Sequence, residues 1–97
     1  MRHEILLAPE ATRDFKRLNA HVRAQVRDAI ELHLRHQPTK TSKSRIKRLR
    51  GLNRPQYRLR VGDVRVFYDV TETRVEVLAV IMKSDAEAWL KEMGGKP

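Results

Sequence analysis

The chain contains no cysteine, few glycines and no long apolar run, and each absence excludes a class of protein. Without cysteine there is no disulfide framework, no thiolate zinc site and no thiol catalysis. The four glycines form no phosphate-binding loop. Because no apolar run approaches the roughly 18 residues of a membrane span, we expect a cytoplasmic protein with no membrane partner. A chain of 97 residues is also too short for two enzyme domains, so residues 1–97 are predicted to form one domain.

Acidic side chains are nearly absent from one segment of the chain. The formal net charge is +9, and residues 40–65 carry ten basic side chains against Asp63 alone. Residues 1–39 hold seven basic and five acidic side chains, and residues 66–97 hold four and six. The whole excess therefore lies in the middle segment. Such a block predicts a polyanionic partner, which could be nucleic acid, an anionic surface or an acidic protein. The alternative is a solvated basic loop.

Hydrophobic periodicity predicts an α+β domain. Residues 3–7 form a short apolar run typical of a strand, and the apolar spacing over 9–18 and 20–36 predicts a helical hairpin. Alternation over 56–82 predicts three strands, and 85–93 predicts a short helix capped by Ser84. The order is β-α-α-β-β-β-α. We expect a mostly antiparallel sheet of about four strands packed by the N-terminal hairpin, with a C-terminal helix.

A two-residue turn at Gly62-Asp63 would determine the register of the predicted hairpin. It pairs Arg60 with Arg65 and places Arg58 opposite Phe67, so that three arginines share one face of the sheet. Opposed residues have Cβ atoms ~5 Å apart, and like charges there destabilise the sheet. A bound anion would offset the repulsion, and local rules fail in this way at functional sites. The arginines therefore predict an anion site.

The alternative interpretation of the hairpin is structural. Asp69 would neutralise Arg58 diagonally, and the other arginines would point to water. On either interpretation the opposite face is apolar and predicted to be the core, as is Trp89. The residues expected on that face are Tyr57, Leu59, Val61, Val64, Val66, Tyr68, Val70, Val75, Val77, Ala79 and Ile81.

Two histidines are spaced for a shared metal, since His33 and His36 lie three residues apart in a predicted helix. A metal site needs further ligands, and none is evident in the pattern. We therefore predict neither a metal site nor a cofactor.

Three motifs occur in a fixed order. Ile46 to Leu52 reads I-K-R-L-R-G-L, Tyr57 to Arg60 reads Y-R-L-R, and Gly62 to Tyr68 reads G-D-V-R-V-F-Y. In this order the motifs resemble the RelE/ParE superfamily of bacterial toxins from type II toxin–antitoxin systems. The segment 83–90 resembles a common ending of RelE-like members, so that the resemblance extends over nearly the whole chain. It implies a RelE-like fold and a cytoplasmic toxin.

The resemblance also implies an activity, which is metal-independent cleavage of messenger RNA in the ribosomal A site. A 2′-hydroxyl attacks the neighbouring phosphate and leaves a 2′,3′-cyclic phosphate. Arg65 would stabilise the phosphorane charge, Arg58 would share that basic site, and Arg60 stands where RelE has a lysine base. Lys83 is the candidate acid. The other cations of the basic block would bind RNA: Lys43, Arg45, Lys47, Arg48, Arg50 and Arg54.

Two departures from the RelE pattern leave other functions open. Arginine is effectively never deprotonated, so Arg60 is a poor base. The segment after the last predicted strand also lacks the further arginines and the tyrosine of RelE-type nucleases. The first alternative is a ParE-like inhibitor of DNA gyrase without nuclease chemistry. The second is a catalytically degenerate basic module that binds nucleic acid.

The resemblance implies partners as well. Under either toxin interpretation we expect a cognate, acidic, partly disordered antitoxin that folds around the domain. Its apolar residues would lie on the helical hairpin and its acidic residues near the arginines. The nuclease interpretation adds messenger RNA and the ribosome. Operator DNA would be bound only through the antitoxin.

Overall fold

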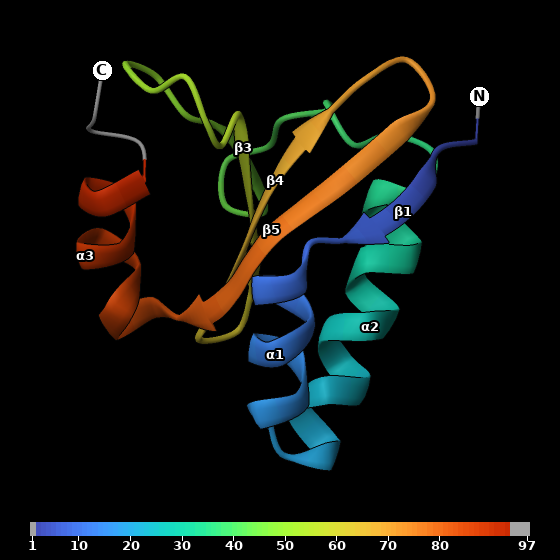
Figure 1. Cartoon of the computed structure of the whole chain (residues 1–97). Helices are drawn as coiled ribbons and strands as arrows, with labels where there is room; N and C mark the ends of the chain where they lie inside the picture. The colour runs from blue at the N-terminus through green and yellow to red at the C-terminus, as the bar shows by residue number, and fades with distance from the viewer. Residues whose placement is uncertain (1, 94–97) are drawn as a thin grey trace.

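Eight elements of secondary structure follow one another in residues 2–93, the part of the chain that the computed structural model describes. They are β1 (Glu4–Leu7), α1 (Pro9–Arg17), α2 (Ala20–Leu34), β2 (Ile46–Arg48), β3 (Tyr57–Val61), β4 (Val64–Val70), β5 (Arg74–Met82) and α3 (Lys83–Met93). The expectation of an α+β fold is confirmed. In Figure 1, α1 and α2 lie together on one side of the sheet and α3 lies apart from them.

The sheet has the order β1-β5-β4-β3-β2, with β1 parallel to β5 and the other pairs antiparallel. Five strands replace the expected four because β2 was not predicted. This strand is three residues long and carries a single apolar side chain, Ile46, opposite Leu59 of β3. It exists because β3 offers a free edge to pair with, which a local pattern does not show.

Two helices differ slightly from their predicted bounds. Asn19 caps α2, since its Oδ1 accepts a hydrogen bond from the amide of Val22 at 2.9 Å. The helix ends at Leu34, earlier than the predicted residue 36. α3 begins at Lys83, directly after β5, so that Ser84 lies inside the helix and does not cap it. The amide of Lys83 donates to the carbonyl of Asp63 at 2.6 Å, which anchors this helix start to the β3–β4 turn.

The main core lies between the α1–α2 hairpin and one face of the sheet. Strand residues such as Leu59, Val66 and Tyr68 are fully buried there against Val26 and Leu34 of α2. Each buried side chain of this size contributes ~1.5–3 kcal/mol. Tyr68 also satisfies its polar end, because its hydroxyl donates to the carbonyl of Pro38 at 2.7 Å. Burial raises the pKa of the Tyr68 hydroxyl.

A bulge in β5 changes which residues reach this core. Phe67 pairs with Ala79 but Tyr68 pairs with Val77, so that β5 has one extra residue between these pairs. Beyond the bulge, Val80 joins the core, while Ala79 and Ile81 share a face with Phe67 and Arg65. The prediction that placed Ala79 and Ile81 on the core face was wrong. Strict alternation along β5 cannot reveal a bulge.

Candidate functional site

The predicted register of the β3–β4 hairpin is confirmed. Arg60 pairs with Arg65, Arg58 pairs with Phe67, and Lys47 of β2 pairs with Arg58 on its other side. Gly62 permits the tight turn, because its φ of +57° is one that glycine adopts readily. We call Lys47, Arg58, Arg60 and Arg65 the arginine face. It lies on the side of the sheet away from α1 and α2.

Arg65 is the one charged residue counted among the buried residues of the described chain, with 6% of its surface exposed. Its Nη1 donates to the carbonyls of Gly62 at 2.8 Å and Val64 at 3.1 Å. Burial lowers the pKa of Arg65, Arg60 lowers it further, and Asp63 acts in the opposite direction. Backbone bonds therefore fix the guanidinium in place without neutralising it.

Arg58 is half-buried beside Arg65 and Arg60. Its Nη2 donates to the carbonyl of Ser44 at 3.3 Å, while its Nε is buried and has no hydrogen-bond partner. Burial lowers the pKa of Arg58 most, and Arg65 and then Arg60 add to the effect. An unused buried donor on a cation is costly, so this group is suited to an acceptor that arrives with a ligand.

The alternative of diagonal neutralisation by Asp69 was wrong. Asp69 binds Arg54, with Oδ2 2.9 Å from Nε, and its other oxygen accepts from the amide of Gln56 at 2.8 Å. None of the ion pairs found among residues 2–93 involves Arg58, Arg60 or Arg65. Three uncompensated guanidinium groups on one face can bind a phosphate, whose oxygens accept paired N–H bonds.

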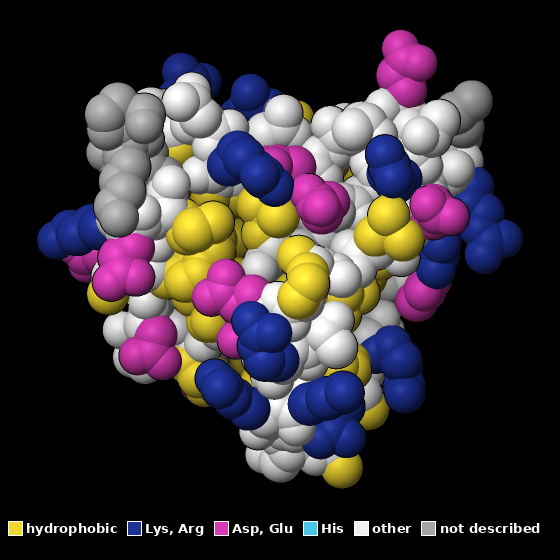
Figure 2. Space-filling view, viewed as in Figure 1, with side chains coloured by type: hydrophobic (Ala, Val, Ile, Leu, Met, Phe, Trp, Pro, Cys, Tyr) yellow, Lys and Arg dark blue, Asp and Glu magenta, His cyan; other side chains and the backbone are white. Residues whose placement is uncertain are grey.

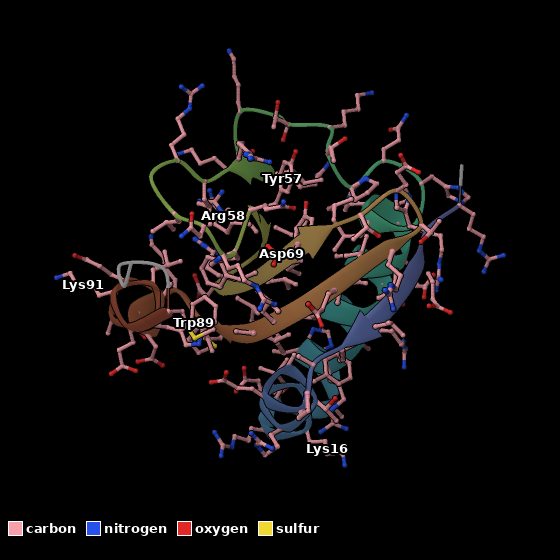
Figure 3. The ribbon with its side chains drawn as sticks, turned by 45° about the horizontal axis from the view of Figure 1, so that its top comes forward. Lys16, Tyr57, Arg58, Asp69, Trp89 and Lys91 are labelled. Carbon is pink, nitrogen blue, oxygen red and sulfur yellow. The ribbon has the colours of Figure 1, made fainter. Side chains whose placement is uncertain are left out.

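α3 brings an aromatic ring to the arginine side of the sheet. Trp89 stacks on Phe67, with ring centroids 5.0 Å apart and an interplanar angle of 19°. Figure 3 shows Trp89 on the same side of the sheet as Arg58. Trp89 was predicted to lie in the core beneath the helical hairpin, but it packs on Phe67, which pairs with Arg58 in the register.

Lys83, the predicted acid, lies outside the strands that carry the arginine face. It is the exposed first residue of α3, and it lines a hollow together with Asp63 and Glu87. The structure therefore groups this lysine with carboxylates.

The six predicted RNA-binding cations are dispersed. Lys47 alone belongs to the arginine face, whereas Arg48 covers the Tyr57 ring at 5.0 Å from its centroid. Arg54 is held by Asp69 and, at 3.0 Å, by Glu76. Arg45 lines a separate pocket beside α2. The remaining two, Lys43 and Arg50, are exposed in the loops on either side of β2.

The face shown in Figure 2 carries both signs of charge. Basic and acidic side chains are interspersed there around apolar groups. Within residues 2–93 no cluster of three or more His, Cys, Asp or Glu side chains could hold a metal ion. No helix in the same part of the chain is long and apolar enough to span a membrane.

Three solved structures share this fold. The RelB–RelE antitoxin–toxin complex of Methanococcus jannaschii has a chain 22% identical, with a TM-score of 0.64 over 87% of this chain and 96% of that one. The RelBE2 toxin–antitoxin complex of Mycobacterium tuberculosis gives 22% identity and a TM-score of 0.66 over 84% and 99%. A chain of the YoeB dimer of Staphylococcus aureus is 15% identical, with a TM-score of 0.61 over 81% of this chain and 94% of that one. The chain therefore has the fold of RelE-like toxins.

The family follows from the sequence. Residues 5–87 match the model of the ParE toxin of the type II toxin–antitoxin system, parDE. The chain belongs to this family and is a type II toxin of the RelE/ParE superfamily, as the motifs predicted. Its partner is a cognate antitoxin. None of the curated proteins compared with the chain matches it.

Proposed function

We propose that this toxin is a metal-independent, ribosome-dependent endoribonuclease that cuts messenger RNA in the A site. One observation carries the proposal: Arg58, Arg60 and Arg65 share a sheet face without carboxylate partners. Phosphodiester cleavage builds negative charge on the phosphorus oxygens, and fixed cations stabilise that charge without reorganising. Arg65 meets this requirement best, because backbone carbonyls hold its buried guanidinium.

The reaction assigns a role to each arginine. The 2′-hydroxyl attacks the adjacent phosphorus, the 5′ oxygen of the next nucleotide leaves, and a 2′,3′-cyclic phosphate remains. Arg65 and Arg58 bind the phosphorane oxygens, and Arg60 orients the 2′-hydroxyl. Arginine cannot accept the proton, and Lys83 lines a hollow with Asp63 and Glu87, so we assign both proton transfers to solvent. We expect cleavage slower by about 10²–10⁴ than that of an enzyme with a placed acid and base.

The basic block supports binding to a large polyanion. Its net charge of +9 over residues 40–65 would steer the toxin to ribosomal RNA and slow its release at low salt. This proposal places the toxin in the cytoplasm, where translating ribosomes are found.

Arg60 offers the sharpest test, because its side chain is exposed and its loss leaves the core intact. Primer extension on a translating messenger should show A-site cuts with the wild type. Arg60→Ala should cut about 100-fold less, and Arg13→Ala, an exposed arginine on α1, should match the wild type. Folded wild-type protein that leaves the A-site codon intact would contradict the proposal.

Inhibition of DNA gyrase is the second candidate, and two observations favour it. The matching family model is that of the parDE toxin, and the arginine face has no histidine, tyrosine or carboxylate to act as acid or base. A supercoiling assay with excess toxin separates the candidates. Inhibition with an intact messenger assigns the toxin to gyrase. If supercoiling is normal and the messenger also stays intact, the protein is a basic binding module without catalytic activity.

A further inference from the structure

A pocket of about 210 Å³ lies between the C-terminal end of α2 and the loop that leads into β2. Its polar lining consists of His33, Gln37, Lys40, Thr41, Ser42 and Arg45. Two of these side chains are permanent cations and a third can become one. None of the residues that line the pocket is acidic. The pocket thus collects positive charge, hydroxyl groups and an amide in one place.

Hydrogen bonds fix the loop that carries the two cations. Ser42 Oγ accepts from the amides of Arg45 at 3.0 Å and Ile46 at 3.2 Å. The amide of Ser42 donates to the carbonyl of Ile46 at 2.9 Å, and that of Lys40 donates to the carbonyl of Gln37 at 3.2 Å. The backbone on both sides of the pocket is therefore set before any ligand binds, which lowers the entropic cost of binding.

The electrostatic surroundings of His33 favour an anion. Burial lowers the pKa of His33, and Arg45 lowers it further. Lys40 and Arg45 face it from the loop, and β2 contributes only the apolar Ile46. The carbonyl ends of α2 favour the protonated imidazole, but no lining carboxylate supports them. A multiply charged oxyanion would compensate all three groups together.

We propose that this pocket, the His33 pocket, binds a phosphate group. Lys40 and Arg45 supply charge, Arg45 can donate two parallel N–H bonds, and Thr41 and Gln37 supply neutral donors. The pocket is distinct from the arginine face but adjoins it, because the amide of Arg60 donates to the carbonyl of Arg45 at 2.8 Å. An RNA strand that crosses the β2 edge would contact both. The RNA source rests on the proposed function, whereas phosphate binding itself does not.

Inorganic phosphate tests the pocket directly in the full-length toxin. Phosphate titrated into the protein should shift the imidazole NMR signals of His33 and raise the pKa of its ring. Lys40→Gln should weaken phosphate binding about tenfold. Lys16→Gln is the matched control, since Lys16 is exposed on α1, lies outside the basic block and does not line the pocket. A His33 signal that does not move, or equal losses in both variants, would overturn the proposal.

A short single-stranded RNA separates the two sources of phosphate. If RNA occupies the pocket, it shifts the imidazole signals of His33 in the wild type, and Lys40→Gln reduces that shift while Lys16→Gln does not. If only inorganic phosphate moves the signal, the site takes free phosphate and the RNA path is wrong. Cleavage by the arginine face is measured separately through Arg60→Ala. Failure of one proposal is therefore distinguishable from failure of the other.

Discussion

On the face of the sheet that packs against α1 and α2, side chains such as Leu59 and Val66 are fully buried. On the other face, Arg60 is exposed and Arg65 is buried without a carboxylate. The two faces are built from the same strands, one residue apart. Burial of an apolar side chain stabilises the fold, whereas burial of a cation costs free energy unless it is paired. One face therefore maintains the fold, whereas the other carries arginines that no carboxylate pairs with in residues 2–93.

The largest expected effect lies on the helix-covered face. Leu59→Ala should lower the free energy of unfolding by about 2–5 kcal/mol, because it removes buried methyl groups and leaves a cavity. Leu32→Ala is the matched control, since Leu32 is 73% exposed and should change stability by less than ~0.5 kcal/mol. Urea unfolding measures both. Similar losses in the two variants would mean that the core lies elsewhere.

Tyr68→Phe should have a smaller effect on the same face. It removes the hydroxyl that binds the Pro38 carbonyl, and an unsatisfied buried acceptor costs about 1–3 kcal/mol. Because burial raises the pKa of Tyr68 in the folded state, the wild type loses stability as pH rises above the unfolded value of ~10. Tyr68→Phe should lose less over that range. If the urea midpoints of the wild type and of Tyr68→Phe fall equally as pH rises, Tyr68 is not the group that causes the alkaline loss of stability.

Arg58→Met should have the smallest effect on stability and a large effect on function. It removes a half-buried cation that two other arginines repel, so unfolding free energy should stay constant or rise by up to about 1 kcal/mol. A-site cleavage should be lost. Arg58 and Leu59 are neighbours in β3 but lie on opposite faces of the sheet. Their two variants therefore compare the two faces within one strand. A loss of stability as large as that of Leu59→Ala would give Arg58 a structural role.

Much of the candidate site could be predicted from local sequence. Alternation from Tyr57 to Val70 and the Gly-Asp turn were sufficient to pair Arg60 with Arg65 and Arg58 with Phe67. The reason is that a two-residue turn leaves a single register. Once the register is known, the pleat decides which side chains share a face.

Other features required partners distant in the chain. From the sequence, Arg54 was predicted to be one more free cation of the basic block, but it forms ion pairs with Asp69 and Glu76. These carboxylates lie on neighbouring strands, 15 and 22 residues away. Trp89 was predicted to be a core residue, but its ring stacks on Phe67, on the side of the sheet that carries the arginine face.

Composition and periodicity by themselves determined the α+β class, the helical hairpin, the β3–β4 register and the three arginines on one face. Each of these depends on interactions between residues close in the chain. The tertiary structure alone decided that β2 exists, that β5 contains a bulge, and that Arg45 joins His33 and Lys40 around a pocket. These features depend on an available strand edge, on packing between sheet and helices, and on charges that meet only after the chain has folded.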